Sequence, residues 1–228
     1  MAAGKDGYFS PKFFGFLGEL ERNNNREWFQ ANKARFDEEV MAPSVRFVAE
    51  AAGKLRAISP HIVADPKPFG GSISRIYRDT RFAKDKRPYH THIGIHFSHD
   101  GMKGGDEHLP GYFVHLEPKE SGVYSGVWHP EGAALTGIRE SIMKKSAEWK
   151  KATKFPVTLW GESLKRPPPG IAADHPMVED LKRKDFIGSV NVTKAQVTGP
   201  KFMDDFIAAC KKMAPLNLFL AKAMGVDW

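Results

Sequence analysis

The segment His92-Ile93-Gly94-Ile95-His96-Phe97 decides the fold class, because its large apolar side chains recur at every second residue. Ile93, Ile95 and Phe97 fall on one side of an extended chain, and the residues between them fall on the other. A period of two predicts a half-buried β-strand. The segment from Tyr112 to Leu116 alternates in the same way, so the sequence predicts two neighbouring strands that share a buried face.

Connections around these strands are short and rich in glycine, which favours antiparallel pairing over crossover connections. We expect the two strands to pair as a hairpin around residues 98–111. Segments 72–78 and 122–129 predict further strands. Val190, Val192 and Val197 suggest one more strand towards the end of the chain.

Helical periodicity covers most of the first sixty residues and returns after the strands. One helix is expected from about Glu131 and others from about Pro200, with an interruption at Pro215. Residues 155–171 contain three consecutive prolines and are expected to form an extended surface loop. This order predicts an α+β fold, an antiparallel sheet of four or more strands flanked by N-terminal and C-terminal helices. We expect residues 8–224 to form a single α+β domain.

The composition of the 228 residues is that of an ordinary globular protein, with 41% hydrophobic and 27% charged residues. A formal net charge of +7 favours anionic partners, although the lysines are spread along the whole chain. Cys210 is the only cysteine, which excludes an intrachain disulfide. No apolar run reaches transmembrane length, so we expect a cytoplasmic protein without a membrane partner.

The segment that leads into the first strand, residues 74–92, combines six Lys or Arg residues with two Asp and three aromatic residues. Cations placed among aromatic rings suit the binding of a phosphate, another anion or a nucleic-acid backbone. The alternative is structural, with Asp79 and Asp85 pairing with the arginines to fix a long loop against the sheet. On a regular strand, Arg75 and Arg78 would point to opposite sides. The candidate ligand-binding residues are Arg75, Tyr77, Arg78, Asp79, Arg81, Lys86 and Arg87.

Histidines gather around the two predicted strands, and strand geometry selects those that can meet. In a hairpin, His92 lies on the sheet face that also carries His115 and Glu117, and the register decides which of the two lies beside it. These three are the candidate catalytic residues, either as zinc or iron ligands or as a general acid–base group. The alternative is that they are ordinary polar side chains on the wetter sheet face. Because no complete metal-binding motif accompanies them, we assign no metal ligand.

Four segments resemble the signature segments of one protein family. The family is the bacterial and fungal one catalogued as domain of unknown function 2461, and the similarity runs in order from about Tyr8 to Met224. The resemblance implies a single-domain cytosolic protein, and it implies no activity, cofactor or catalytic residue. The segments are Asn24-Asn25-Arg26-Glu27-Trp28-Phe29, Arg75-Ile76-Tyr77-Arg78-Asp79-Thr80-Arg81-Phe82, Asp85-Lys86-Arg87-Pro88-Tyr89 and Gly111-Tyr112-Phe113-Val114-His115-Leu116-Glu117-Pro118.

Three functions are compatible with these residues. The first is a binding protein for a phosphorylated or other anionic ligand, nucleic acid included, in a basic cleft lined by aromatic residues. The second is a hydrolase or metal-dependent enzyme that uses His92, His115 and Glu117. The third is a structural scaffold without a small-molecule site. The sequence does not decide whether the chain is an enzyme, and it assigns neither a cofactor nor an oligomeric state.

Overall fold

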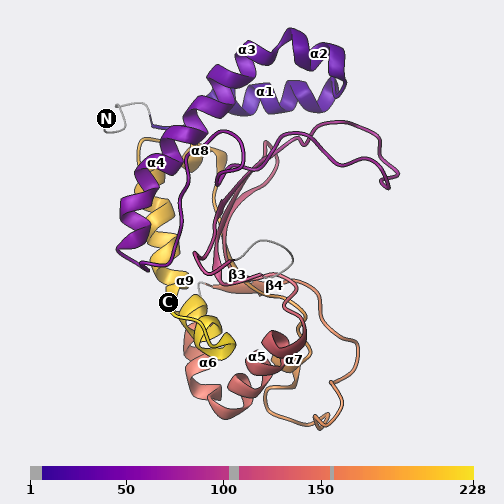
Figure 1. The fold of residues 1–228 in the computed structure, drawn as a ribbon, viewed down its shortest axis with the longest axis vertical. Helices are drawn as coiled ribbons and strands as arrows, with labels where there is room; N and C mark the ends of the chain where they lie inside the picture. Colours follow the sequence, from indigo (N-terminus) through magenta and orange to yellow (C-terminus); the bar gives the residue numbers. More distant parts are fainter. Residues whose placement is uncertain (1–6, 103–107, 155–156) are drawn as a thin grey trace.

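The computed structural model describes residues 7–102, 108–154 and 157–228. Helices come first, strands follow, and the last two strands alternate with further helices (Figure 1). The N-terminal helices are α1 (Pro11–Arg22), α2 (Arg26–Ala31), α3 (Lys33–Phe36), the π-helical turn η1 (Asp37–Met41) and α4 (Ala42–Arg56). The strands are β1 (Ile93–Phe97), β2 (Gly111–Leu116), β3 (Ser121–Val127), β4 (Thr158–Trp160) and β5 (Phe186–Asn191). The later helices are α5 (Gly132–Lys144), α6 (Ser146–Ala152), α7 (Val178–Leu181), α8 (Lys194–Val197) and α9 (Phe202–Met224).

The strands form one five-stranded antiparallel sheet in the order β1-β2-β3-β5-β4. Strands β1 and β2 pair as the predicted hairpin, with Ile93 opposite Leu116 and Phe97 opposite Tyr112. The sheet, with helices on both its N-terminal and C-terminal sides in the chain, confirms the predicted α+β class. Within the described residues, no helix combines the length and the apolarity needed to span a membrane.

One face of the sheet is packed against helix α9, and helix α4 packs against α9 beside it (Figure 1). The predicted apolar positions Ile95, Phe97 and Val114 are completely buried on this face. The hydroxyl of Tyr112 donates a hydrogen bond to the carbonyl of Cys210 in α9 at 3.1 Å. Cys210 is a buried free thiol, and burial raises its pKa well above the ordinary value. The face that packs on α9 is therefore a conventional hydrophobic core, and the opposite face of the sheet is not covered by α9.

Local sequence signals place several helix ends. Pro11 occupies the first turn of α1, where its missing N–H breaks no intrahelical bond. The Asn25 side chain caps α2 by accepting a hydrogen bond from the Trp28 N–H at 2.9 Å. Thr193 and Gln196 form a reciprocal capping box at the start of α8. The assignment of Val197 to a strand was therefore wrong, because this capped turn ends the strand before it.

Two other expectations in the C-terminal half were wrong. Helix α9 continues through Pro215, although proline removes one backbone donor. Burial along α9 and a hydrogen bond from the Asn217 amide to the Gly111 carbonyl, 3.0 Å long, hold the helix against the sheet. Residues 155–171 are not all loop, because Thr158–Trp160 adds the edge strand β4 to β5.

The segment 72–78 is not a regular strand. It runs beside residues 88–96 through hydrogen bonds from Ser74 N to Gly94 O and from His90 N to Ile76 O. Between these two bonds, Arg75 alone lies opposite residues 91–93. The two extra residues in 91–93 form a bulge that interrupts the regular pairing of the two segments.

Candidate functional site

The face of the sheet opposite α9 carries a row of rings. Cross-strand register places His96 beside Phe113 and Phe113 beside Tyr124. Ring centroids of these pairs lie 4.4 Å and 6.0 Å apart, and the Tyr124 ring meets Trp160 of β4 at 5.7 Å. We call these four residues together with His115 the ring row. It crosses the sheet from β1 to β4.

Gly122 allows the Tyr124 ring to lie flat against the sheet. A side chain at Gly122 would place its Cβ 2.8 Å from the Tyr124 hydroxyl oxygen. Such a contact is too short for any real Cβ, so the absence of a side chain at Gly122 leaves room for the Tyr124 ring.

A cavity of about 650 Å³ opens over the ring row. This volume is in the range of sites for small organic molecules. Its walls are mainly aromatic, and the charged residue among the described lining residues is Glu120. The aromatic residues and histidines among its described lining residues are His96, Phe97, His108, Tyr112, Phe113, His115, Tyr124, Trp128 and Trp160.

The three candidate catalytic residues meet at one end of the ring row. The His92 and His115 rings lie 4.5 Å apart, and His115 Nε2 lies 3.2 Å from Glu117 Oε2. The Thr91 hydroxyl donates to the other carboxylate oxygen of Glu117, also at 3.2 Å. Both oxygens of Glu117 are thus engaged, which fixes the carboxylate beside His115. Their catalytic role stays a prediction.

Burial determines the protonation state of His92 in this cluster. It lowers the pKa of His92 to about 4, with help from the neighbouring His115 and His90. Burial also lowers the pKa of His90, and the positive charges of Arg78 and Arg75 add to the effect. His92 is therefore neutral at physiological pH. Among the described residues, this cluster does not bring three donor atoms within metal-binding distance of one another.

In the basic segment, residues 74–92, three arginines pair with aspartates of the same segment. Asp85 Oδ2 accepts from Arg87 Nε at 2.8 Å and from Arg78 Nη1 at 3.0 Å. Asp79 pairs with Arg81, and Lys86 donates to the carbonyl of Thr80. Hydrogen bonds from Arg87, followed by those from Arg78, hold the pKa of Asp85 well below its ordinary value. These contacts are the ion pairs of the structural alternative.

Arg75 differs from the other arginines of the segment. Its side chain is exposed and forms no hydrogen bond or ion pair within the part of the chain that the structure describes. Its charge nevertheless contributes, with that of Arg78, to the lowered pKa of His90. The charges of both arginines therefore act on the histidine end of the sheet.

Tyr77 and Tyr89 anchor the basic segment to helix α2. The Phe29 ring stacks on Tyr89 at 4.2 Å and meets Tyr77 edge-on at 6.1 Å. The Asn24 side chain binds both backbone groups of Tyr89, at 2.9 Å and 3.0 Å. The segment around Asn24 therefore serves to hold the segment around Tyr89.

These contacts join three of the four segments that carry the family resemblance. The family described as conserved hypothetical protein (DUF2461) matches residues 12–219. The chain belongs to the DUF2461 family. This match confirms the resemblance seen in the sequence. Neither curated proteins nor solved structures gave a significant match.

In this DUF2461 protein, several site residues escaped sequence reasoning. Trp160 lies on β4, inside the segment predicted as loop, and its short strand gave no periodic signal. His129 and Asp185 are 56 residues apart, yet His129 Nδ1 lies 2.6 Å from Asp185 Oδ1. Trp128, which lines the cavity, packs against the His129 ring at 4.4 Å. Tyr124 could have been found from the alternation of 122–129 if the buried side of that strand had been clear.

Proposed function

We propose that the open sheet face binds a small organic anion, with a flat ring in the cavity and a phosphate or carboxylate at the histidine end. The observation that carries this proposal is the position of His115. It lines the aromatic cavity and also touches His92, which lies beside His90. One ligand that spans His115 would therefore reach both environments.

The ring row supports the flat part of such a ligand. Aromatic side chains contribute large contact areas and stack on planar groups such as nucleobases. Trp160 and Trp128 remain about half exposed, at 46% and 53%, so their surfaces are free for a ligand. A cavity with aromatic walls and few polar groups matches the usual composition of small-molecule sites.

The charge distribution favours one small anionic group over a nucleic-acid backbone. Arg78, Arg81 and Arg87 already pair with aspartates, so a ligand would have to compete for them. Arg75 is exposed and pairs with no carboxylate within the described residues, and His90 lies within reach of its charge. A polyanion needs a line of free cations, whereas one phosphate needs one or two.

Binding of adenosine 5′-monophosphate and of adenosine, measured by calorimetry, tests this proposal. Wild type should bind the monophosphate more tightly than the nucleoside. Arg75→Gln should remove most of that difference, and Trp160→Ala should weaken both ligands at least about tenfold, because stacking on an aromatic ring is worth about 1–3 kcal/mol. Lys150→Gln, on the exposed surface of α6, is the control and should change neither affinity.

Unchanged affinities in both variants, or no binding by wild type, would leave the scaffold as the better account. In that case Arg78→Ala should lower the melting temperature without altering any binding. The same set of variants therefore distinguishes a ligand-binding protein from a structural scaffold.

A second function has its own observation. Glu117 fixes the His115 ring at the cavity wall, which is the arrangement of a general base with an orienting carboxylate. A hydrolase built this way would use His115 to take a proton from water. Release of nitrophenol from p-nitrophenyl phosphate and p-nitrophenyl acetate tests it. Activity that His115→Gln abolishes and Glu117→Gln reduces would support the enzyme, and activity unchanged by His115→Gln would reject it.

A further inference from the structure

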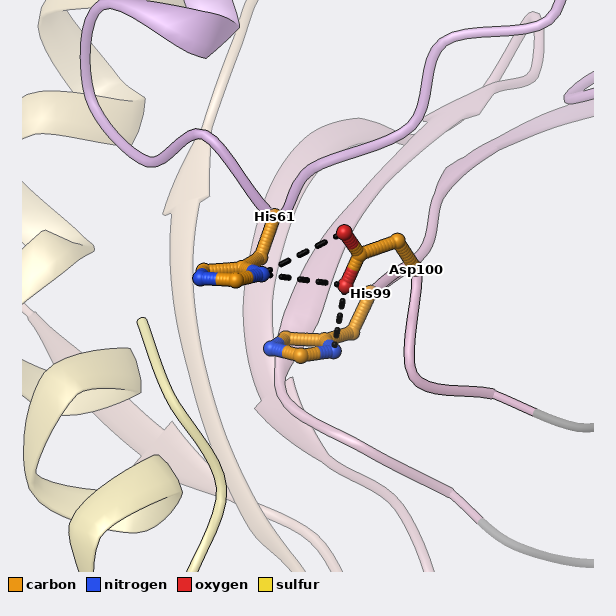
Figure 2. Close-up of side chains that lie close together, drawn as sticks. All are labelled: His61, His99 and Asp100. Atoms are coloured by element: carbon orange, nitrogen blue, oxygen red, sulfur yellow. Dashed lines mark hydrogen bonds and ion pairs between the residues drawn. The ribbon is translucent and has the colours of Figure 1, made fainter.

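A second cluster lies away from the ring row. His61 follows helix α4, and His99 and Asp100 follow strand β1 (Figure 2). Two backbone hydrogen bonds, each 2.8 Å long, clamp the segments together: Val63 N donates to Ser98 O, and Asp100 N donates to His61 O. The backbone therefore presents the three side chains to one another before any ligand arrives.

Both imidazoles lie close to the carboxylate of Asp100. His61 Nδ1 lies 3.1 Å from Asp100 Oδ1, and His99 Nδ1 lies 3.4 Å from the same oxygen. The two imidazole rings are stacked, with centroids 5.2 Å apart and planes within 6°. Figure 2 shows both Nδ1 atoms turned towards the carboxylate. All three ligand atoms lie within 4.8 Å of one another.

The hydrogen bonds of His99 determine where its proton sits. The Gly101 N–H donates to His99 Nδ1 at 3.0 Å, so Nδ1 carries no hydrogen. His99 Nε2 carries it and donates to the Asp227 carbonyl at 2.8 Å. His99 Nδ1 and Asp100 Oδ1 are then two electron-rich atoms, 3.4 Å apart, with no hydrogen between them. A cation placed there would relieve their repulsion.

We propose that His61, His99 and Asp100 bind a divalent transition-metal ion, with Zn²⁺ as the best fit. Zinc prefers imidazole nitrogen and carboxylate oxygen at about 2.0–2.2 Å, so neighbouring ligand atoms of a tetrahedral site lie roughly 3.4 Å apart. The two spacings to Asp100 Oδ1 match this edge length. Water completes the fourth position, since Asp100 is half exposed.

The surroundings of His99 are those of a metal ligand. Ligating histidines donate their other ring N–H to a carboxylate or a backbone carbonyl, as His99 does to Asp227. His99 is only 4% exposed, so its orientation is fixed by packing. Binding exchanges the Gly101 hydrogen bond for a metal–nitrogen bond. The proton on His61 Nδ1 moves to Nε2 of the same ring. The two neutral histidines therefore bind the ion without releasing a proton.

This metal site is independent of the proposed ligand site. His61, His99 and Asp100 are not among the described residues that line the cavity, and the His99 ring lies near Trp228 instead. The ion would tie the connection after α4 to the end of β1. Its expected effect is stabilisation of the fold.

Calorimetric titration of ZnCl₂ into the full chain, purified without an affinity tag and stripped with a chelator, tests the site. Wild type should bind one ion per chain and melt at a higher temperature with zinc. His61→Gln and Asp100→Ala should each weaken binding at least about tenfold and reduce the zinc-dependent rise. These ligands are partly exposed, so the apo variants should melt close to apo wild type.

His92→Gln is the matched control, because it removes a histidine from the other cluster. It should leave zinc binding unchanged. Wild-type zinc affinity in His61→Gln and Asp100→Ala, or zinc binding lost only in His92→Gln, would overturn the proposal. Neither outcome bears on nucleotide binding, so the two sites succeed or fail separately.

Discussion

Asp85 holds Arg78 at a distance of 3.0 Å, and this pair determines how much positive charge the basic segment offers to a ligand. The same carboxylate oxygen also binds Arg87. Arg78 and Arg87, two of the candidate ligand-binding arginines, are therefore paired with the Asp85 carboxylate. A ligand at this end of the sheet meets Arg75 first.

Replacing Asp85 should change the response of the protein to acid. The lowered pKa of Asp85 means that its contribution to stability is complete above its unfolded value, about 3.9, and is lost as the pH falls below it. Asp85→Asn should melt at a lower temperature than wild type at pH 7, and the gap should narrow below pH about 4. Melting curves across this range check it, and a gap that stays constant with pH would contradict it.

His92 should make the protein less stable in mild acid. Its pKa of about 4 lies below the unfolded value of about 6.5, so the unfolded chain binds the proton first. Stability should be complete above pH about 6.5 and should fall as the pH drops towards 4. Allowing for partial exposure, His92 should account for about 1–2 kcal/mol of this loss. Urea unfolding of wild type and His92→Gln at pH 7.5 and pH 5 measures the difference, which should be absent if the ring is freely solvated.

Gly126 should tolerate no side chain. Its φ is +125°, and a Cβ there would lie 2.0 Å from the Phe186 carbonyl oxygen of the neighbouring strand. Gly126→Ala should cost about 3 kcal/mol or more in the free energy of unfolding. Gly15→Ala is the control, because Gly15 lies exposed in α1 with open space around its Cβ position. It should stabilise the protein by about 0.5–1 kcal/mol. Equal effects of the two substitutions in urea unfolding would refute the argument.

Asp185 should be more important for stability than its neighbour Asp180. Asp185 is 2% exposed and accepts hydrogen bonds from the backbone N–H groups of His129 and Glu162. Asp185→Ala leaves both donors without a partner and should cost about 3 kcal/mol. Asp180→Ala removes a partly exposed ion pair with Arg183 and should cost less than about 1 kcal/mol. Denaturant titration compares them, and similar losses would argue that water replaces the Asp185 carboxylate.

The sequence was most informative where contacts follow from local periodicity. Alternation in β1 and β2 was enough to predict the hairpin and to bring His92 near His115 and Glu117. The register itself was left open between two choices, because each choice buries the same apolar residues. In the structure Ile93 pairs with Leu116, and the His92 ring lies 4.5 Å from the His115 ring.

The remaining features depend on contacts that local periodicity does not encode. Strand β4 has three residues, and its partner β5 follows 26 residues after it. His61 and Asp100 are 39 residues apart and meet through the backbone ladder that follows β1. In the basic segment, the arginine partners of Asp79 and Asp85 and the bulge in residues 91–93 are visible only in the structure. No spacing in the sequence marks such a bulge.

The way the sheet ends has a consequence for the behaviour of the protein at high concentration. The outer edge of β1 is occupied by residues 72–74, through Ser74 N to Gly94 O and His96 N to Ser72 O. The other edge is β4, whose three residues offer few free backbone groups. Intermolecular sheet growth needs a long unpaired edge. The fold therefore gives a second molecule little free sheet edge on which to add a strand.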